Sequence, residues 1–175
     1  MRKVTVSPYN QQWAAMFAEE AEVLRGIFGP EIVAIHHIGS TSVPGLAAKP
    51  IIDILPVVRD IGRIDVYNAK MAAAGYEPKG ENGIPGRRYF QKGGDQRTHH
   101  VHVFQVGSPE IERHLAFRDY LKAHPDEAKA YGELKARLAE RYPYDIESYI
   151  KGKEQRVREI ERRAVRWYRE VFLGK

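Results

Sequence analysis

One carboxylate interrupts an otherwise apolar run near the middle of this sequence. Asp53 lies within the segment IIDILPVV, residues 51–58. Removing a carboxylate from water is costly, so Asp53 should be paired with a cation, hydrogen-bonded, or placed at the exposed end of a strand. Asp53 is therefore a candidate catalytic or metal-binding residue. A structural carboxylate, paired with a basic neighbour, is the alternative.

A short polar loop precedes this segment. Gly39, Ser40, Thr41 and Ser42 follow a stretch rich in β-branched residues. A small-residue loop at a strand end, followed by a short helical turn, can offer backbone N–H groups and hydroxyls to a phosphate. Lys49 is close enough in sequence to add a positive charge. Gly-Ser is also a common turn, so the pair alone does not indicate phosphate binding. The neighbouring hydroxyls, helical turn and lysine are what favour it.

A histidine-rich segment, residues 99–104, offers nitrogen ligands. Side chains alternate along a strand, so His100 and His102 should share one face and His99 should lie on the other. Such a pair can chelate a metal, although most strand histidines do not. If this strand lies beside that of Asp53, the three side chains could hold a divalent ion. Magnesium or manganese would suit the carboxylate, and zinc or nickel would suit ligating histidines.

Two further basic residues are candidates for phosphate binding. Arg88 belongs to the segment RRYF, a hairpin candidate that could hold phosphates or stack on a base. A solvent-facing edge strand protected by its charges explains that segment nearly as well. Lys153 interrupts the apolar seam of the last expected helix, so its ammonium either reaches the surface or points into a polar cavity.

Hydrophobic periodicity predicts the elements that must position these residues. Three- and four-residue steps predict helices over about residues 10–28 and 60–75, and helical structure from residue 108 with breaks near 124–125 and 143. The last helix begins near residue 145, with the seam Ile146, Ile150, Lys153, Val157, Ile160, Ala164, Trp167 and Val171. The expected strands are residues 31–38, 51–58, 76–79, 87–92 and 98–106. The pattern predicts an α+β fold with a mixed sheet of four or five strands flanked by helices.

Composition limits the classes of protein to consider. With 175 residues and 43% hydrophobic content, the chain suits a single domain, residues 1–175. It has no apolar run long enough for a membrane span and no apolar leader, so we expect a cytoplasmic protein. The absence of cysteine leaves His, Asp and Glu as metal ligands. The net charge of +5 permits an anionic partner, but much of the surplus lies in the C-terminal helix among glutamates, which favours a solvated helical face. No nucleic-acid reader motif is present, so we do not expect direct nucleic-acid binding. The polar loop and Lys49 are what suggest a small nucleotide or another phosphate-bearing ligand.

The segments HIGSTSVPGLAAKPIIDI and RTHHVHVF resemble the GrpB family, and the resemblance covers almost the whole chain. It implies a divergent nucleotidyltransferase fold, with an α/β core over residues 1–107 and C-terminal helices over 108–175. In the wider superfamily a Gly-Ser pair helps bind the triphosphate, which Gly39 and Ser40 match. Acids spaced by one residue on the next strand hold metal there. Asp53 matches the first acid, and Leu55 stands at the second.

Three functions stay open from the sequence. The first is an enzyme of the nucleotidyltransferase type, which transfers a phosphoryl-linked group. The second is a non-catalytic accessory protein that binds a nucleotide or coenzyme, since the resemblance includes domains fused to dephospho-coenzyme A kinase. The third is a metal-dependent hydrolase built on the histidines. Leu55 counts against two-metal transfer, so catalysis, substrate, acceptor and oligomeric state are left undecided.

Overall fold

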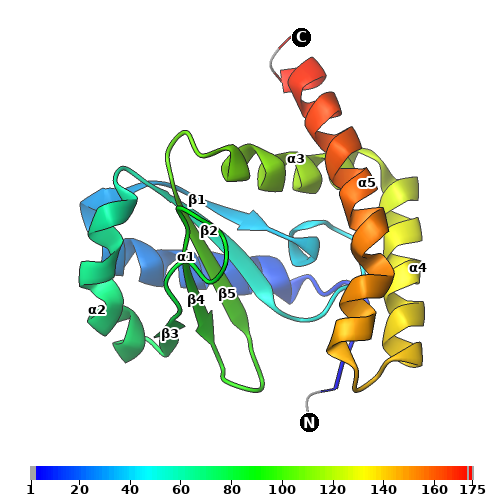
Figure 1. The fold of residues 1–175 in the computed structure, drawn as a ribbon, viewed down its shortest axis with the longest axis horizontal. Helices are drawn as coiled ribbons and strands as arrows, with labels where there is room; N and C mark the ends of the chain where they lie inside the picture. The colour runs from blue at the N-terminus through cyan, green and yellow to red at the C-terminus, as the bar shows by residue number, and fades with distance from the viewer. Residues whose placement is uncertain (1–2, 173, 175) are drawn as a thin grey trace. The chain divides into compact units, whose positions relative to one another are not determined.

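The computed structural model describes residues 3–172 and 174. Two compact units divide the chain, and each is assembled from segments far apart in the sequence (Figure 1). The sheet unit comprises residues 12–38 and 51–111. The helical unit comprises the described parts of residues 1–11, 39–50 and 112–175. Residues 39–50, expected within the α/β core, thus belong to the helical unit.

Five strands form one mixed sheet in the order β1-β2-β5-β4-β3. The strands are β1 (Ile32–Ile38), β2 (Ile52–Val58), β3 (Tyr76–Pro78), β4 (Arg88–Lys92) and β5 (His99–Gln105). β2 and β5 pair in parallel, and the other neighbours pair antiparallel. The register sets Asp53 opposite His100. The predicted α+β class and mixed sheet are confirmed, and the histidine strand does lie beside the Asp53 strand.

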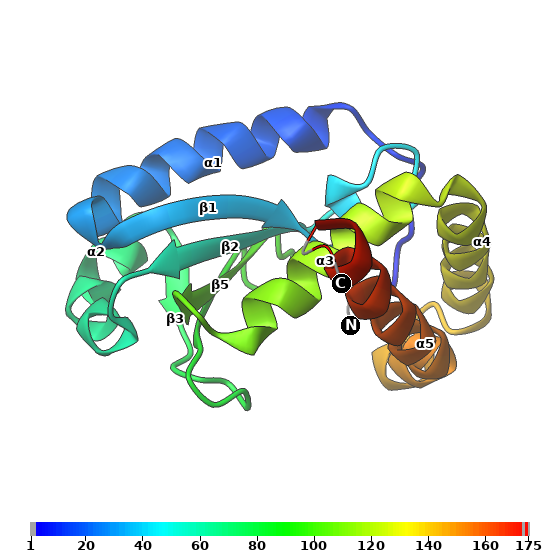
Figure 2. The same ribbon diagram turned by 90° about the horizontal axis from the view of Figure 1, so that it is seen from above.

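Helix α1 (Gln12–Phe28) covers one face of this sheet (Figure 2). Its buried stripe includes Leu24 and Phe28, as the sequence predicts. Glu20 is buried on the same stripe. Its carboxylate accepts a hydrogen bond from the Tyr76 hydroxyl at 2.7 Å and pairs with the Lys92 ammonium at 3.0 Å. The polar partners that burial demands for a carboxylate are therefore present here.

The segment after β2 differs from the single helix expected over residues 60–75. A 3-10 helix, η3 (Ile61–Tyr67), leads into a short α-helix, α2 (Asn68–Ala73). The Asp60 side chain caps η3 by accepting a hydrogen bond from the Gly62 backbone N–H. Gly62 and the β-branched residues of this segment are weak α-helix formers. The expected helix is therefore wrong in its first half.

Three long helices follow the sheet: α3 (Pro109–Ala123), α4 (Pro125–Arg141) and α5 (Ile146–Phe172). The predicted breaks fall at His124 and Pro143. Within the helical unit α4 and α5 lie side by side (Figure 1). The expected seam of α5 is correct in its middle, where Ile160 and Ala164 are buried, and wrong at both ends, where Ile146, Ile150 and Val171 are exposed. Among the described residues, no helix is both long and apolar enough to span a bilayer.

The turn between β4 and β5 requires glycine at residue 93. Gly93 has a φ of +103°, and a Cβ atom there would lie 2.4 Å from the backbone carbonyl oxygen of Gln96. Gly93→Ala should therefore lower the free energy of unfolding by about 2–4 kcal/mol. Gly94→Ala is the matched control, since its φ is +58° and its Cβ would meet nothing within 4 Å. Its expected cost is about 1 kcal/mol. Urea unfolding measures both, and equal losses would contradict the steric argument.

Candidate functional site

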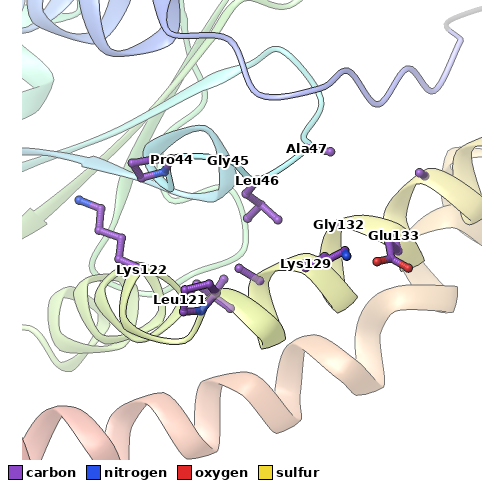
Figure 3. A pocket seen from close by; sticks show the side chains of 12 residues that line it. Pro44, Gly45, Leu46, Ala47, Leu121, Lys122, Lys129, Gly132 and Glu133 are labelled. Carbon is purple, nitrogen blue, oxygen red and sulfur yellow. The ribbon is translucent and has the colours of Figure 1, made fainter.

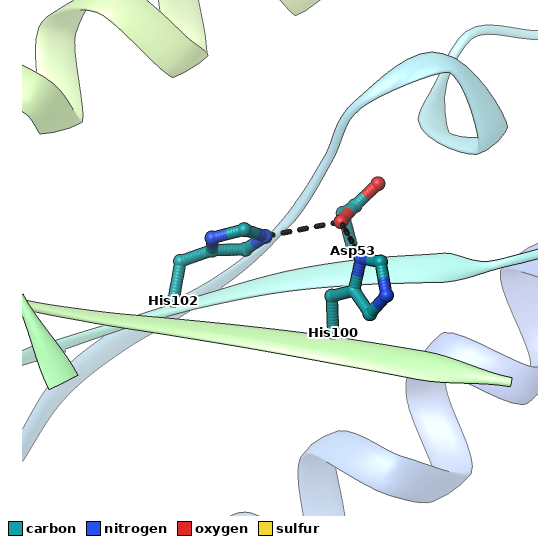
Figure 4. A group of neighbouring side chains, drawn as sticks. All are labelled: Asp53, His100 and His102. Atoms are coloured by element: carbon teal, nitrogen blue, oxygen red, sulfur yellow. Dashed lines mark hydrogen bonds and ion pairs between the residues drawn. The ribbon is translucent and has the colours of Figure 1, made fainter. Parts of the chain in front are cut away.

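Three polar side chains meet on one face of the sheet unit. Asp53 comes from β2, and His100 and His102 come from β5 (Figure 4). The Asp53 Oδ1 atom lies 3.0 Å from Nε2 of His102 and 3.4 Å from Nδ1 of His100. One potential ligand atom from each residue lies within 4.8 Å of the other two. The sequence predicts this cluster only if the histidine strand lies beside the Asp53 strand. The parallel pairing of β2 with β5 meets that condition.

The Asp53 side chain is 27% exposed, and the two imidazoles are less exposed still. Burial by itself would raise the pKa of Asp53. Hydrogen bonds from His100 and His102 outweigh this effect, so the pKa of Asp53 is held well below its usual range. The carboxylate is ionised at neutral pH and accepts a hydrogen bond from each of the two imidazoles. It is therefore the negative centre of the cluster.

Arg87 adds a third basic side chain to this face. Its Nη1 atom lies 3.2 Å from Nδ1 of His102, and its guanidinium lies over the Tyr89 ring at 4.8 Å. Hydrogen bonds to the carbonyl oxygens of Glu81 and Asn82, at 3.1 Å and 2.9 Å, hold the guanidinium in place. Arg87 is 7% exposed. It is therefore a fixed part of the cluster and not a surface charge.

The donor set of this cluster suits a divalent cation in part. The ionised Asp53 oxygen is a ligand for hard and borderline metals, and His100 offers an imidazole nitrogen. Nδ1 of His100 donates to the ionised Asp53 carboxylate, and the buried Nε2 atom of His100 has no hydrogen-bond partner among the described residues. No donor therefore opposes a move of the ring proton to Nε2, which would free the Nδ1 lone pair for a cation. His102 differs, because Arg87 occupies its second nitrogen. Asp53 therefore fits a cation, and so does His100 once its proton has moved to Nε2, whereas His102 does not.

The predicted phosphate loop lies in the helical unit. Gly39 has a φ of +73° and leads into a 3-10 turn, η2 (Ser40–Ser42). The loop closes on itself, because both the backbone N–H and the hydroxyl of Ser42 donate to the Gly39 carbonyl. Thr41 and Ser42 are buried. The Ser40 hydroxyl hydrogen-bonds to the side chain of Tyr131 from α4.

Three lysines and two tyrosines form a second cluster, also within the helical unit, which we call the lysine cluster. The ammonium groups of Lys49 and Lys153 each lie 5.3 Å from the centroid of the Tyr149 ring. The Lys135 ammonium lies 4.5 Å from the centroid of the Tyr131 ring. Lys49 and Lys153, predicted separately for phosphate binding, are thus brought to the same tyrosine.

Lys135 is the most unusual member of the lysine cluster. It is 2% exposed, and within the described part of the chain neither its Nζ atom nor the buried Tyr149 hydroxyl has a hydrogen-bond partner. Burial, followed by the positive charges of Lys153 and Lys49, lowers the pKa of Lys135 to about 6. Buried polar groups normally find partners. The Lys135 amine and the Tyr149 hydroxyl lie beside two further lysines, and all of these groups can donate hydrogen bonds to an anion.

The helical unit also contains a cavity of about 370 Å³ (Figure 3). Its lining is mostly apolar and comes from the loop residues Pro44–Ala47 and from α3 and α4. Lys122, Lys129 and Glu133 are the charged residues on its wall. None of the residues predicted to bind phosphate or metal lines it. The cavity is therefore not the site to which the sequence pointed.

Sequence reasoning chose Arg88 from the Arg87–Arg88 pair and passed over Lys135. The Arg88 guanidinium pairs with Asp65 at 2.8 Å, whereas Arg87 reaches His102. The strand register explains the difference. Tyr89 lies opposite His102, so Arg87, two residues before Tyr89, lies on the histidine face and Arg88 lies on the other face. Lys135 gave no comparable signal, because it is one lysine among many on a polar helix.

Comparison with known proteins places the chain in a family. A family model described as GrpB protein matches residues 3–163. UPF0157 protein YqkA of Bacillus subtilis (strain 168) is 58% identical over 166 residues, which are 95% of this chain and 48% of that protein. The chain therefore spans about half the length of this relative.

Solved structures agree with the family match. The crystal structure of conserved protein GrpB from Enterococcus faecalis has a TM-score of 0.91 and 45% identity, and the match covers 94% of this chain and 99% of that one. A structure of Cid1, studied for its RNA terminal uridylyl transferase activity, has a TM-score of 0.52 and 16% identity over 78% of this chain and 44% of that one. This distant likeness concerns the fold alone. The chain belongs to the GrpB family and has a nucleotidyltransferase-like α+β fold.

Proposed function

We propose that this chain binds a nucleotide, or another phosphate-bearing small molecule, and a divalent cation, and that it acts as a transferase of the nucleotidyltransferase type. The observation that carries the proposal is the ionised Asp53 carboxylate beside His100 on adjacent central strands. The fold is nucleotidyltransferase-like, which supports the proposal. The Gly39-Ser40 pair after β1 matches the Gly-Ser pair that helps bind the triphosphate in the wider superfamily.

The cation part of the proposal rests on Asp53. A carboxylate that stays ionised while partly buried is a ligand for magnesium or manganese, which take further ligands from water and phosphate oxygens. When bound, such a cation would withdraw charge from a phosphoryl group. The protein's own contribution is to orient the carboxylate through His100 and His102.

The phosphate part rests on the lysine cluster. Lys49, Lys135 and Lys153 bring three amines together. Among the described residues, the buried Lys135 amine and the buried Tyr149 hydroxyl have no hydrogen-bond partner. A phosphate group accepts several hydrogen bonds and offsets the mutual repulsion of the amines. Ser40 belongs to the same unit and hydrogen-bonds to Tyr131 of the lysine cluster, so we include its loop in the proposed phosphate site. Arg88 stays a weaker candidate, because Asp65 already pairs with it.

A second candidate function, binding without chemistry, is favoured by one observation. Leu55 lies on the face of Asp53, at the position where a second acid would stand, and it is fully buried. Two-metal phosphoryl transfer uses acids to hold both cations. Without the second acid, this chain would have to catalyse transfer with a single cation. A turnover assay with the four nucleoside triphosphates separates the candidates. Pyrophosphate release supports the transferase, and tight binding without product supports the accessory protein.

Asp53→Asn should abolish the proposed cation site while keeping the shape of the side chain. We expect the affinity for ATP in excess Mg²⁺ to fall at least about tenfold, because the amide lacks the charge that holds the cation. Isothermal titration measures the affinity. Asp95→Asn is the matched control, since Asp95 is an exposed carboxylate of the same unit. Wild-type affinity in Asp53→Asn would overturn the cation part of the proposal.

Lys135 should make nucleotide binding depend on pH. Its pKa of about 6 leaves the amine neutral above that pH in the absence of ligand. A nearby phosphate favours the charged form and raises this pKa, so binding takes up a proton, and affinity rises as the pH falls toward 6. At about pH 8, where phosphate groups are fully ionised, titration of ATP in buffers of different ionisation enthalpy measures the uptake.

The variants of this experiment separate Lys135 from other lysines of α4. Lys135→Met should bind ATP without proton uptake, whereas Lys129→Met, an exposed lysine of the same helix, should behave as the wild type. If the wild-type protein binds ATP with no proton uptake at about pH 8, then Lys135 does not meet the phosphates.

A further inference from the structure

The contact between Arg87 and His102 decides which histidine nitrogen carries a proton. An arginine side chain only donates hydrogen bonds. The Nδ1 atom of His102, 3.2 Å from Nη1 of Arg87, must therefore accept and cannot hold a hydrogen. An ionised carboxylate only accepts, so Nε2 of His102, 3.0 Å from Oδ1 of Asp53, must donate. Both neighbours require the same tautomer, with the single ring proton on Nε2.

This tautomer has a consequence for cation binding. A ligating imidazole nitrogen needs its lone pair, and the second nitrogen then carries the proton and donates it to an acceptor. For His102 to bind a cation through Nε2, its proton would have to move to Nδ1, where it would face a donor. Contacts with the carbonyl oxygens of Glu81 and Asn82 and with the Tyr89 ring help to hold that donor in place.

We propose that Arg87 makes His102 a hydrogen-bond donor to Asp53 and prevents it from acting as a metal ligand. The cation site then has two protein ligands, Asp53 and His100. Its remaining positions are left for water oxygens. This inference rests on the proposed function for the presence of a cation, but the role of Arg87 does not. It also separates the site from a zinc centre, which normally has three or four protein ligands.

Nitrogen NMR of the wild-type protein tests the tautomer without any change to Arg87. Long-range ¹H–¹⁵N correlations of the imidazole rings, with His102 assigned by its loss in His102→Gln, should show Nε2 protonated and Nδ1 unprotonated. A proton on Nδ1 would overturn the role of Arg87. On addition of Zn²⁺, a diamagnetic probe, the His100 nitrogens should shift and His102 should keep its pattern. Loss of the Nε2 proton from His102 would overturn the two-ligand site. No shift at His100 would overturn both that site and the cation part of the proposed function, while the tautomer result would stand.

Substitution of Arg87 gives a second test. Arg87→Met should release His102 as a third ligand and raise the affinity for Zn²⁺ at least about tenfold. The gain should vanish in the double variant Arg87→Met/His102→Gln. Arg63→Met is the matched control, because its exposed guanidinium pairs with Asp60 and not with a histidine. Circular dichroism checks that each variant is folded. A folded Arg87→Met variant with wild-type Zn²⁺ affinity would contradict the proposal.

Discussion

The parallel pairing of β2 with β5 is the constraint on which the candidate site depends. It sets Asp53 beside His100 in the middle of a five-stranded sheet. Side chains alternate along each strand, so a register shift of one residue would send the histidines to the face that α1 covers. The apolar residues that fix this register are Ile52, Ile54, Val101 and Val103, all buried. Packing on one face therefore positions the chemistry on the other.

Both candidate sites contain buried polar groups that have no hydrogen-bond partner among the described residues. The Asp53 carboxylate is stabilised by two imidazoles, but in the described part of the chain the buried Nε2 atom of His100 has no hydrogen-bond partner. In the lysine cluster the pKa of Lys135 falls because burial and two further lysines disfavour its charge. Such arrangements cost stability and are rarely kept for folding alone. A cation at one and a phosphate at the other would each offset that cost.

Much of the fold could be predicted from local pattern, because alternation and three- to four-residue steps reflect burial directly. The strands, the helix breaks at His124 and Pro143, and the shared face of His100 and His102 all followed from it. The segment 61–67 did not, because one glycine and a capping aspartate changed the helix type. The exposed ends of α5 show that an apolar pattern needs a neighbour to cover it.

The site was harder to predict, since it depends on which strands become neighbours. Asp53 stood out because a carboxylate in an apolar strand is costly, and no tertiary knowledge was needed. Arg87 required the register of β4 on β5, which only the sheet order supplies. Lys135 required the packing of α4 within its unit, because burial and not sequence spacing makes it unusual. Asp53 could therefore be predicted from its local sequence, whereas Arg87 and Lys135 could be recognised only from the tertiary structure.

The most direct test of the account is the position of a cation in crystals grown with Mn²⁺ and a non-hydrolysable ATP analogue. Anomalous scattering from manganese locates the ion without reference to the protein atoms. The account predicts one peak within coordination distance of the Asp53 carboxylate and the His100 imidazole, with His102 still hydrogen-bonded to Asp53. Well-ordered analogue with no manganese peak at Asp53 would contradict it.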